Sequence, residues 1–408
     1  MPTLLSINNY YYRRGGAEVV FLEQNRLFEE IGWQVVPFAM RHADNLPTQW
    51  QDYFVDEIEF GSDYSLLEKA TRASKVIYSF EARKKIAILA EKVQPNVAHA
   101  HNVYHHISPV IFGKLKALGI PTILTLHDLK IACPSYSMLT HDGLCERCKG
   151  GAIWNVVVHK CIKDSFLLSS LIMLETATHR LLGSYANDVD RFVVPSRFLI
   201  EKFVEWGWAR ERFSYIPNFV DTREFIPRGD VGKGFVYLGR LSYEKGLGTF
   251  IRAIALAGVK GWIVGSGPKE QELRQLAEEL NADVEFLGYK TGEEMADTIR
   301  HARAMVLPSE CYENAPMSVL EAYALERPVI GANIGGIPEL IRVGETGDLF
   351  PSGDAEALAE KLRQFSAMSD DTILAMGKTG RKWAEQNFTA TRYRERLIDL
   401  YRSIGISV

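Results

Sequence analysis

Short apolar runs alternate with stretches of helical periodicity through the first half of the chain. Residues 4–8 form an apolar run of strand length, and residues 17–31 follow with apolar side chains on one helical face, ended by Gly32. Four further apolar runs lie at residues 33–38, 95–101, 121–126 and 190–195. Because parallel strands need crossover helices between them, the pattern predicts a parallel α/β sheet that closes near residue 195.

A second series of the same kind begins at Gly234. Its apolar runs lie at residues 235–239, 262–265, 284–288, 304–307 and 328–331. Proline and glycine interrupt regular structure between residues 216 and 233, so we place a domain boundary near residue 220. The sequence thus predicts two doubly wound α/β domains, residues 1–220 and 221–385, and a final helix in residues 386–408 that can pack back across their junction.

Composition and charge narrow the classes of function. The 408 residues carry 47 Lys and Arg against 51 Asp and Glu, a net charge of −4, which offers no general attraction for nucleic acid. The longest apolar stretches fall far short of the roughly 18 residues that a membrane span needs. No secretory signal pattern follows Met1, so we expect a cytoplasmic protein.

Residues that follow the strands of a parallel sheet meet at one edge, where ligands bind. Gly15 and Gly16 follow the first strand at a helix start, where unpaired backbone N–H groups favour an anion, although a plain tight turn would also need two glycines. Arg240 and Lys245 follow the first strand of the second series. Two such cations suit a diphosphate, and the alternative is a pair of ordinary solvated charges.

Two carboxylates stand out in residues 309–322, after the apolar run at 304–307. Pro316 suits the first position of a helix whose N-terminus points at the strand ends. Glu313 falls just before that helix, and Glu321 lies about a turn and a half inside it. One carboxylate can face a sugar ring and the other the hydroxyls of a ribose, although both can also simply complement the positive helix end.

The order of these motifs resembles the retaining glycosyltransferases of family 4. The segments that carry the resemblance are the E-x7-E pair Glu313 and Glu321, Gly-Gly-Ala-Glu at 15–18, His127-Asp128, Pro217-Asn218, Gly-Arg-Leu-Ser-Tyr-Glu-Lys-Gly at 239–246 and Gly-Gly-Ile-Pro-Glu at 335–339. The resemblance spans nearly the whole chain. It implies the GT-B architecture, in which two Rossmann-like domains face each other across a cleft and the last helix returns to the first domain.

The resemblance also implies a role for each matching residue. Arg240 and Lys245 would bind the donor diphosphate, while Glu313 and His127 would contact the donor sugar. The other donor-binding positions would be Gly15, Gly16, Gly265, Gly267, Tyr289, Asn314, Ala315, Pro316, Met317 and Glu321. Two cationic side chains and a helix dipole can supply the positive field for a diphosphate, so we expect catalysis without a metal cofactor.

The acceptor side is less defined. A cluster of histidines at 99, 101, 105 and 106 invites a metal site, which we reject because no carboxylate stands nearby to orient the ligands. His101 and Asn102 are instead expected to contact the acceptor. The function we expect is retaining transfer from a nucleoside diphosphate sugar, UDP before GDP, to a glycan or lipid-linked acceptor. The alternatives are a noncatalytic nucleotide-sugar-binding subunit and a nicotinamide-dependent oxidoreductase, and the missing third glycine after Gly265 and Gly267 disfavours the latter.

Four of the five cysteines lie within 29 residues, in a predicted insertion at about 129–165. Cys145 and Cys148 have the C-x2-C spacing of a zinc knuckle, and Cys133 and Cys161 can complete four thiolate ligands. Buried apolar thiols are the alternative. We expect a structural zinc that pins the loop after His127.

A stretch from about residue 65 to 93 has a long helical pattern with many basic residues. They are Lys69, Arg72, Lys75, Arg83, Lys84, Lys85 and Lys92. Such a helix can lie on an anionic membrane surface, while a solvated basic face is the simpler interpretation.

Overall fold

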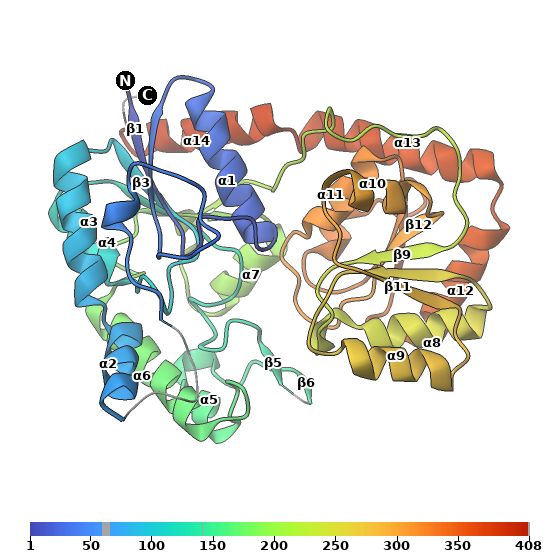
Figure 1. Ribbon diagram of the computed structural model, residues 1–408, viewed down its shortest axis with the longest axis horizontal. Helices are drawn as coiled ribbons and strands as arrows, with labels where there is room; N and C mark the ends of the chain where they lie inside the picture. Colours follow the sequence, from blue (N-terminus) through green and yellow to red (C-terminus); the bar gives the residue numbers. More distant parts are fainter. Residues whose placement is uncertain (59–65, 141, 407–408) are drawn as a thin grey trace.

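Two six-stranded parallel sheets, one in each half of the chain, form the centre of the molecule in a computed structural model (Figure 1). The structure describes residues 1–58, 66–140 and 142–406, without the side chains of residues 66–71. Helices lie on either side of each sheet. This confirms the predicted class, two doubly wound α/β domains.

The first sheet has the strand order β2-β1-β3-β4-β7-β8. Its strands are β1 (Thr3–Ile7), β2 (Gln34–Phe38), β3 (Val97–Ala100), β4 (Thr122–Thr125), β7 (Arg191–Val194) and β8 (Phe213–Tyr215). β1 pairs in parallel with both β2 and β3, which places the loop after β1 in the middle of the sheet edge. The prediction that the sheet closes near residue 195 is wrong, because β8 adds one further parallel strand beside β7.

Seven α-helices accompany the first sheet in the described part of the chain. They are α1 (Gly16–Glu29), α2 (Leu66–Ile77), α3 (Phe80–Val93), α4 (Val110–Ala117), α5 (Asn155–Val158), α6 (Phe166–Leu182) and α7 (Arg197–Glu205). The single long helix predicted at 65–93 is wrong, because Ser79 starts a new helix by accepting a hydrogen bond from the Ala82 N–H. Residue 65 and the Lys69 side chain lie outside the described residues.

The second sheet has the order β11-β10-β9-β12-β13-β14, that of a dinucleotide-binding fold. Its strands are β9 (Phe235–Leu238), β10 (Gly261–Val264), β11 (Val284–Gly288), β12 (Ala304–Leu307), β13 (Val329–Ala332) and β14 (Gly347–Phe350). The helices around it are α8 (Leu247–Ala257), α9 (Glu270–Glu279), α10 (Gly292–Arg300), α11 (Met317–Ala324), α12 (Ala355–Ala367) and α13 (Asp370–Asn387). The edge strand β14 was not among the predicted strands.

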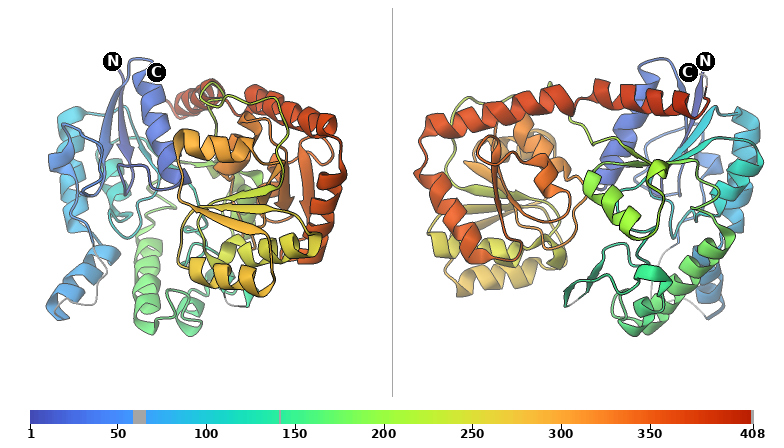
Figure 2. Two further views of the ribbon diagram at one scale, coloured as in Figure 1. Left: turned by 45° about the vertical axis from the view of Figure 1, so that its right-hand side comes forward. Right: turned by 180° about the vertical axis from the view of Figure 1, so that it is seen from behind.

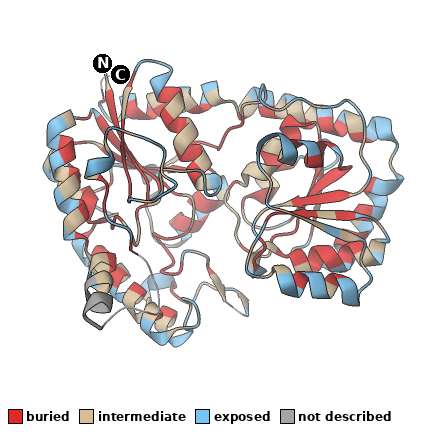
Figure 3. Cartoon of the chain, viewed as in Figure 1, coloured by how far each residue is buried: buried red, intermediate tan, exposed pale blue. Residues whose placement is uncertain are grey.

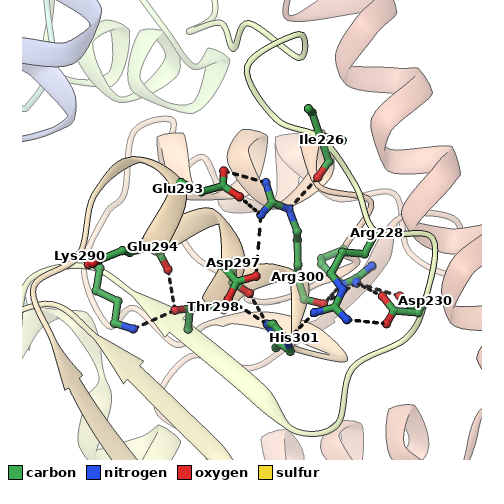
Figure 4. Close-up of polar contacts among 11 residues, drawn as sticks. Ile226, Arg228, Asp230, Lys290, Glu293, Glu294, Asp297, Thr298, Arg300 and His301 are labelled. Carbon is green, nitrogen blue, oxygen red and sulfur yellow. Dashed lines mark hydrogen bonds and ion pairs between the residues drawn. The ribbon is translucent and has the colours of Figure 1, made fainter.

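The polar stretch at 227–233 belongs to the second domain. Arg300, near the end of α10, donates from Nε to the Ile226 carbonyl at 2.6 Å and is paired with Glu293 (Figure 4). Arg327, a fully buried guanidinium, donates to the Asp230 carbonyl at 2.8 Å. These bonds hold the backbone at residues 226 and 230 against the second domain.

The last helix, α14 (Ala390–Ser403), returns to the first domain, as the view from behind in Figure 2 shows. Tyr393, Leu397 and Tyr401 are buried there in one apolar cluster with Phe28. The Tyr401 hydroxyl lies 2.7 Å from Nδ1 of His99. The chain therefore crosses between its two domains twice.

Burial follows the layers of the fold (Figure 3). Every residue of β1, β3, β4, β12 and β13 is buried, because helices cover both faces of these strands. Among the described residues, no helix has both the length and the hydropathy that crossing a bilayer requires.

Candidate active site

The centre of the candidate site is a close ion pair in the second domain. Lys245 lies in the loop between β9 and α8, and its Nζ donates to Oε1 of Glu313, in the loop after β12, at 2.7 Å. Ser309 donates its hydroxyl to the same oxygen at 2.7 Å. Burial raises the pKa of Glu313, but the charge and hydrogen bond of Lys245 outweigh it, so the pKa lies below its ordinary value. The carboxylate is therefore ionised at neutral pH.

Two helix N-termini from different domains meet beside this pair. A Cβ added to Gly16, the first residue of α1, would lie 3.6 Å from Cγ of Met317, the first residue of α11. Pro316 has an extended ψ of 123° and is the cap of α11, so the prediction of Pro316 as its first helical residue is wrong by one position. Unpaired N–H groups and the helix dipole make each such end attractive to an anion. Their proximity suits a ligand with two phosphates.

Arg240 and the two glycines after β10 occupy neighbouring loops. Arg240 is exposed, so its guanidinium is open to a ligand. A Cβ on Gly265 would come within 1.9 Å of the Gly239 carbonyl oxygen, and one on Gly267 within 2.2 Å of the Leu241 carbonyl oxygen. Both glycines are thus required for the loop after β10 to pack against the loop that carries Arg240.

Glu321 lies on the second turn of α11. Burial raises its pKa to about 7. Within the described part of the chain, no hydrogen bond or ion pair to its carboxylate is seen. Hydrogen-bond donors from a ligand, such as the hydroxyls of a ribose, would stabilise the ionised form of this buried carboxyl group. Tyr289, just after β11, is 67% exposed and leaves a flat face for a base.

Three histidines of the first domain form a stack toward the site. The rings of His99 and His101 are stacked, and so are those of His101 and His127. Nδ1 of His101 lies 2.8 Å from Nε2 of His127, and burial lowers the pKa of His127 to about 4. His101 is only 1% exposed and lies between the rings of His99 and His127, and its expected contact with the acceptor stays a prediction.

Glu18, to which the sequence analysis gave no role, is a buried glutamate at the start of α1. Burial raises the pKa of Glu18, while its own backbone N–H and the side chains of Asn8 and Asn102 hydrogen-bond its carboxylate. Asn8 in turn accepts from the Asn102 N–H at 3.0 Å. Asn102, expected to contact the acceptor, thus joins the loop after β3 to the N-terminus of α1.

Asn314 connects the two domains at the site. Its Nδ2 donates to the carbonyl of Leu126, the residue before His127, at 3.0 Å, and its Oδ1 accepts from the Ser196 hydroxyl at 2.8 Å. The carbonyl of Ala315 accepts from Nδ2 of Asn218 at 2.8 Å. The loop after Glu313 is therefore held against the first domain by side-chain hydrogen bonds.

The glycines at 335 and 336 pack closely against the loop that carries Glu313 and Asn314. A Cβ on Gly336 would lie 1.9 Å from the Asn314 carbonyl oxygen, and the Gly336 N–H donates to the Glu313 carbonyl at 2.8 Å. Glu339 accepts from the backbone N–H of Arg197, at the start of α7 in the other domain, at 2.8 Å. This segment thus supports the loop that carries Glu313.

The four cysteines of the insertion come together in the fold. Cys133, Cys145, Cys148 and Cys161 all line one cavity of about 10 Å³, and all are free thiols. In the described part of the chain, no three His, Cys, Asp or Glu side chains are already arranged as a set that could hold a metal ion. The expected zinc stays a prediction.

Sequence comparison agrees with this geometry. A family model described as Glycosyltransferase Family 4 matches residues 14–224, slightly more than half of the chain. The chain belongs to glycosyltransferase family 4. A second model, described as Glycosyl transferases group 1, matches residues 232–367 of this family 4 member, the domain that carries Lys245 and Glu313.

Three curated relatives illustrate the range of similarity. A Salmonella typhimurium protein with the provisional name colanic acid biosynthesis glycosyltransferase is 31% identical over 48% of the chain and 53% of its own length. An uncharacterised protein from the cps region of Klebsiella pneumoniae is 26% identical over 83% of the chain and 87% of its own length. A Corynebacterium glutamicum protein named as a GDP-mannose-dependent mannosyltransferase is 28% identical over 54% of the chain and 64% of its own length. The family 4 member therefore spans about half the length of the Salmonella relative.

Solved structures share the fold over nearly the whole chain. Sucrose-phosphate synthase from Thermosynechococcus elongatus superposes with a TM-score of 0.70 at 19% identity, covering 99% of both chains. The Anabaena protein HepE, solved with UDP and glucose, has a TM-score of 0.71 at 16% identity and covers 99% of this chain and 100% of its own. The likeness shows the GT-B arrangement of two Rossmann-like domains.

Proposed function

We propose that this family 4 member is a retaining glycosyltransferase. It transfers a sugar from a nucleoside diphosphate sugar, UDP in preference to GDP, to a glycan or lipid-linked saccharide, as in polysaccharide synthesis. The observation that carries this proposal is the ion pair of Lys245 and Glu313 beside the meeting N-termini of α1 and α11. It combines positive groups for a diphosphate with a fixed carboxylate for a sugar.

The leaving diphosphate is bound by groups of both domains. Lys245 uses one of its three N–H donors for Glu313 and has two left for phosphate oxygens. Arg240 supplies a planar fork from the same loop, and the backbone at Gly16 and Met317 supplies N–H donors. These groups stabilise the negative charge that grows on the leaving group as the glycosidic bond breaks, without a metal cofactor.

The sugar is bound between Glu313 and His127. The ionised carboxylate of Glu313 stabilises positive charge at the anomeric carbon, and neutral His127 donates a hydrogen bond to a sugar hydroxyl from the first domain. We favour front-face attack by the acceptor hydroxyl on the side of the departing phosphate. The acceptor proton passes to that phosphate, and the configuration at the anomeric carbon is retained.

The nucleoside is assigned to α11 and β11. Glu321 accepts from the ribose hydroxyls, and the base lies near Tyr289. The named relatives support different bases, because HepE was solved with UDP whereas the Corynebacterium protein is named for GDP-mannose. We place UDP first, and we place the protein in the cytoplasm with peripheral membrane contact through the basic helices α2 and α3.

A ligand panel and a transfer assay test this proposal together. UDP, GDP, ADP and NAD are added separately, and the unfolding midpoint is measured, because only ligands of the native state raise it. We expect UDP to give the largest rise and EDTA to change transfer little. A rise with NAD alone would point to an oxidoreductase. A rise with UDP but no sugar transfer to any glycan or lipid-linked acceptor would instead support a noncatalytic nucleotide-sugar-binding subunit.

A further inference from the structure

The insertion between β4 and α6 lies outside the donor site. It contains the hairpin of β5 (Leu139–Thr140) and β6 (Gly143–Leu144), which Figure 1 shows extending toward the second domain, followed by a short turn and α5. Its first part, through Met138, joins the core of the first domain, whereas the described residues of 139–165 add only Cys148 and Val156 to the buried apolar side chains. A segment with so few buried apolar groups usually needs a covalent or metal link to keep its shape. The four cysteines of the insertion are the obvious candidates for that link.

The four thiols are brought to one place from separate parts of the insertion. Cys133 lies in the segment between β4 and β5, Cys145 and Cys148 flank the turn after β6, and Cys161 follows α5. All four nevertheless line the same cavity of about 10 Å³. A space of that volume holds about one water-sized group. Gly150, two residues beyond Cys148, has a φ of 69°, the left-handed conformation in which the chain can turn back around a bound ion.

We propose that Cys133, Cys145, Cys148 and Cys161 bind one structural Zn²⁺ with four thiolate sulfurs. On binding, each thiol loses its proton to solvent, so one Zn²⁺ replaces four protons and the site carries a net charge of −2. The proposal does not depend on the proposed transferase activity.

The charges around the cluster agree with this stoichiometry. Two guanidinium groups are near enough to act on these sulfurs, that of Arg180 on Cys148 and that of Arg147 on Cys161. Their positive charges would partly balance the net charge of −2 that four thiolates and one Zn²⁺ carry.

The metal would position one contact between the domains. Glu146 lies inside the C-x2-C turn, and its Oε1 accepts from Nζ of Lys202 at 2.9 Å and from the hydroxyl of Tyr312 at 3.3 Å. Tyr312 directly precedes Glu313 in the second domain. A zinc that holds the turn would thus keep Glu146 in reach of the loop that carries Glu313.

Metal analysis of the full chain tests the proposal. The protein is purified without chelators from medium that contains zinc, and we expect about one zinc per chain by elemental analysis. Replacement by Co²⁺ should give the thiolate-to-cobalt charge-transfer absorption and the intense visible bands of tetrahedral S4 coordination. Removal of the metal should speed trypsin cleavage at Arg147 and Lys149 at least tenfold, because the turn loses its constraint.

The matched variants separate this site from the fifth cysteine. Cys145→Ser with Cys148→Ser should reduce zinc to below about a tenth of an atom per chain, whereas Cys311→Ser should retain it. Should the double variant not fold, the metal content and Co²⁺ spectrum of the unaltered chain decide the question. Zinc-free protein with four alkylatable thiols and no cobalt band, or a disulfide between two of the four cysteines, would overturn the proposal.

Discussion

Lys245 and Glu313 neutralise each other across 2.7 Å at the edge of the second sheet, although 68 residues separate them in the chain. Their side chains are only 26% and 13% exposed. Neither charge is well solvated without its partner, so the pair holds both groups in place before any ligand arrives. Arg240 comes from the same loop as Lys245 but differs from it in being exposed. The two cations of that loop should therefore respond differently to substitution.

Lys245→Ala should lower both the stability of the protein and its affinity for nucleotide. Arg240→Ala should lower the affinity for nucleotide alone. Loss of Lys245 leaves the Glu313 charge unpaired, which costs about 1–3 kcal/mol and lowers the unfolding midpoint by several degrees. Adding Glu313→Ala should recover part of that loss. Calorimetric titration with UDP should show about tenfold weaker binding for Arg240→Ala at an unchanged midpoint. Near-wild-type transfer by the variant lacking both cations would disprove the diphosphate assignment.

The sheets could be predicted from sequence, because buried parallel strands appear as apolar runs whatever their neighbours. Of the strands in the two six-stranded sheets, β8 and β14 escaped prediction; both lie at sheet edges, where two of three and two of four residues are only partly buried. Their short sequences therefore lack a continuous apolar run. The break between α2 and α3 depends on the single cap Ser79, which the basic periodicity of residues 65–93 conceals.

From the sequence, we could predict the residues of the candidate site that come soon after a strand, but not the contacts between residues far apart in the chain. Lys245 and Glu313 each come soon after a strand of the second sheet, so a local rule finds them. Ser196 and Asn314 are 118 residues apart, and their bond exists only because the two domains pack together. The contact of Glu146 with Tyr312 spans 166 residues. No local sequence pattern indicates a partner at such a distance. Ser309, which was also missed, could have been found from its position just after β12.

Glu313→Gln should preserve nucleotide affinity and lose most sugar transfer. A glutamine amide can still accept from Lys245 and Ser309, so the loop keeps its shape, but the negative charge that faces the anomeric carbon is gone. We expect kcat to fall at least about 100-fold, a common loss when a charge that acts on the transition state is removed. UDP affinity should change less than about threefold in calorimetry.

The comparison variant is Glu321→Ala, which removes the ribose acceptor and should weaken UDP binding by about tenfold or more. The two glutamates are thereby distinguished by separate assays. Equal loss of UDP affinity in Glu313→Gln and Glu321→Ala would show that this division of roles is wrong.

Binding of the donor should strengthen as the pH rises through 7. Glu321 has a pKa of about 7 in the free protein, and only its ionised form accepts from both ribose hydroxyls. Between pH 6 and pH 8 the ionised fraction rises from about a tenth to about nine tenths, which predicts up to about tenfold tighter binding. A UDP-sugar is the right ligand, because the free phosphate of UDP itself titrates in this range. Glu321→Gln should bind with little pH dependence.

The same carboxyl group should make folding less favourable at alkaline pH. Its folded pKa of about 7 exceeds the ordinary value of 4.5, so the unfolded chain ionises first and gains stability as the pH rises between these values. The unfolding midpoint of Glu321→Gln should therefore exceed that of the wild type at pH 8, and the difference should vanish below about pH 4.5. Parallel pH profiles for both proteins would contradict the assignment of the raised pKa to Glu321.

His101 should act as a positioning residue for His127. Nδ1 of His101 and Nε2 of His127 share one proton across 2.8 Å, and Nε2 of His101 is buried without a partner in the described structure. A buried N–H without an acceptor is rarer than a buried acceptor without a donor, which favours His101 as the donor. Nε2 of His127 then accepts, and its Nδ1–H is left to donate to the sugar.

His101→Leu should therefore reduce kcat about tenfold, since His127 loses the bond that fixes its tautomer and ring orientation. UDP affinity should be unchanged, because neither ring is assigned to the nucleotide. His101→Asn provides the matched rescue: its side-chain N–H can take the place of the imidazole Nδ1–H and should restore most of the rate. Equal losses in the leucine and asparagine variants, or a loss of UDP affinity in either, would show that His101 serves the packing of the core and not the orientation of His127.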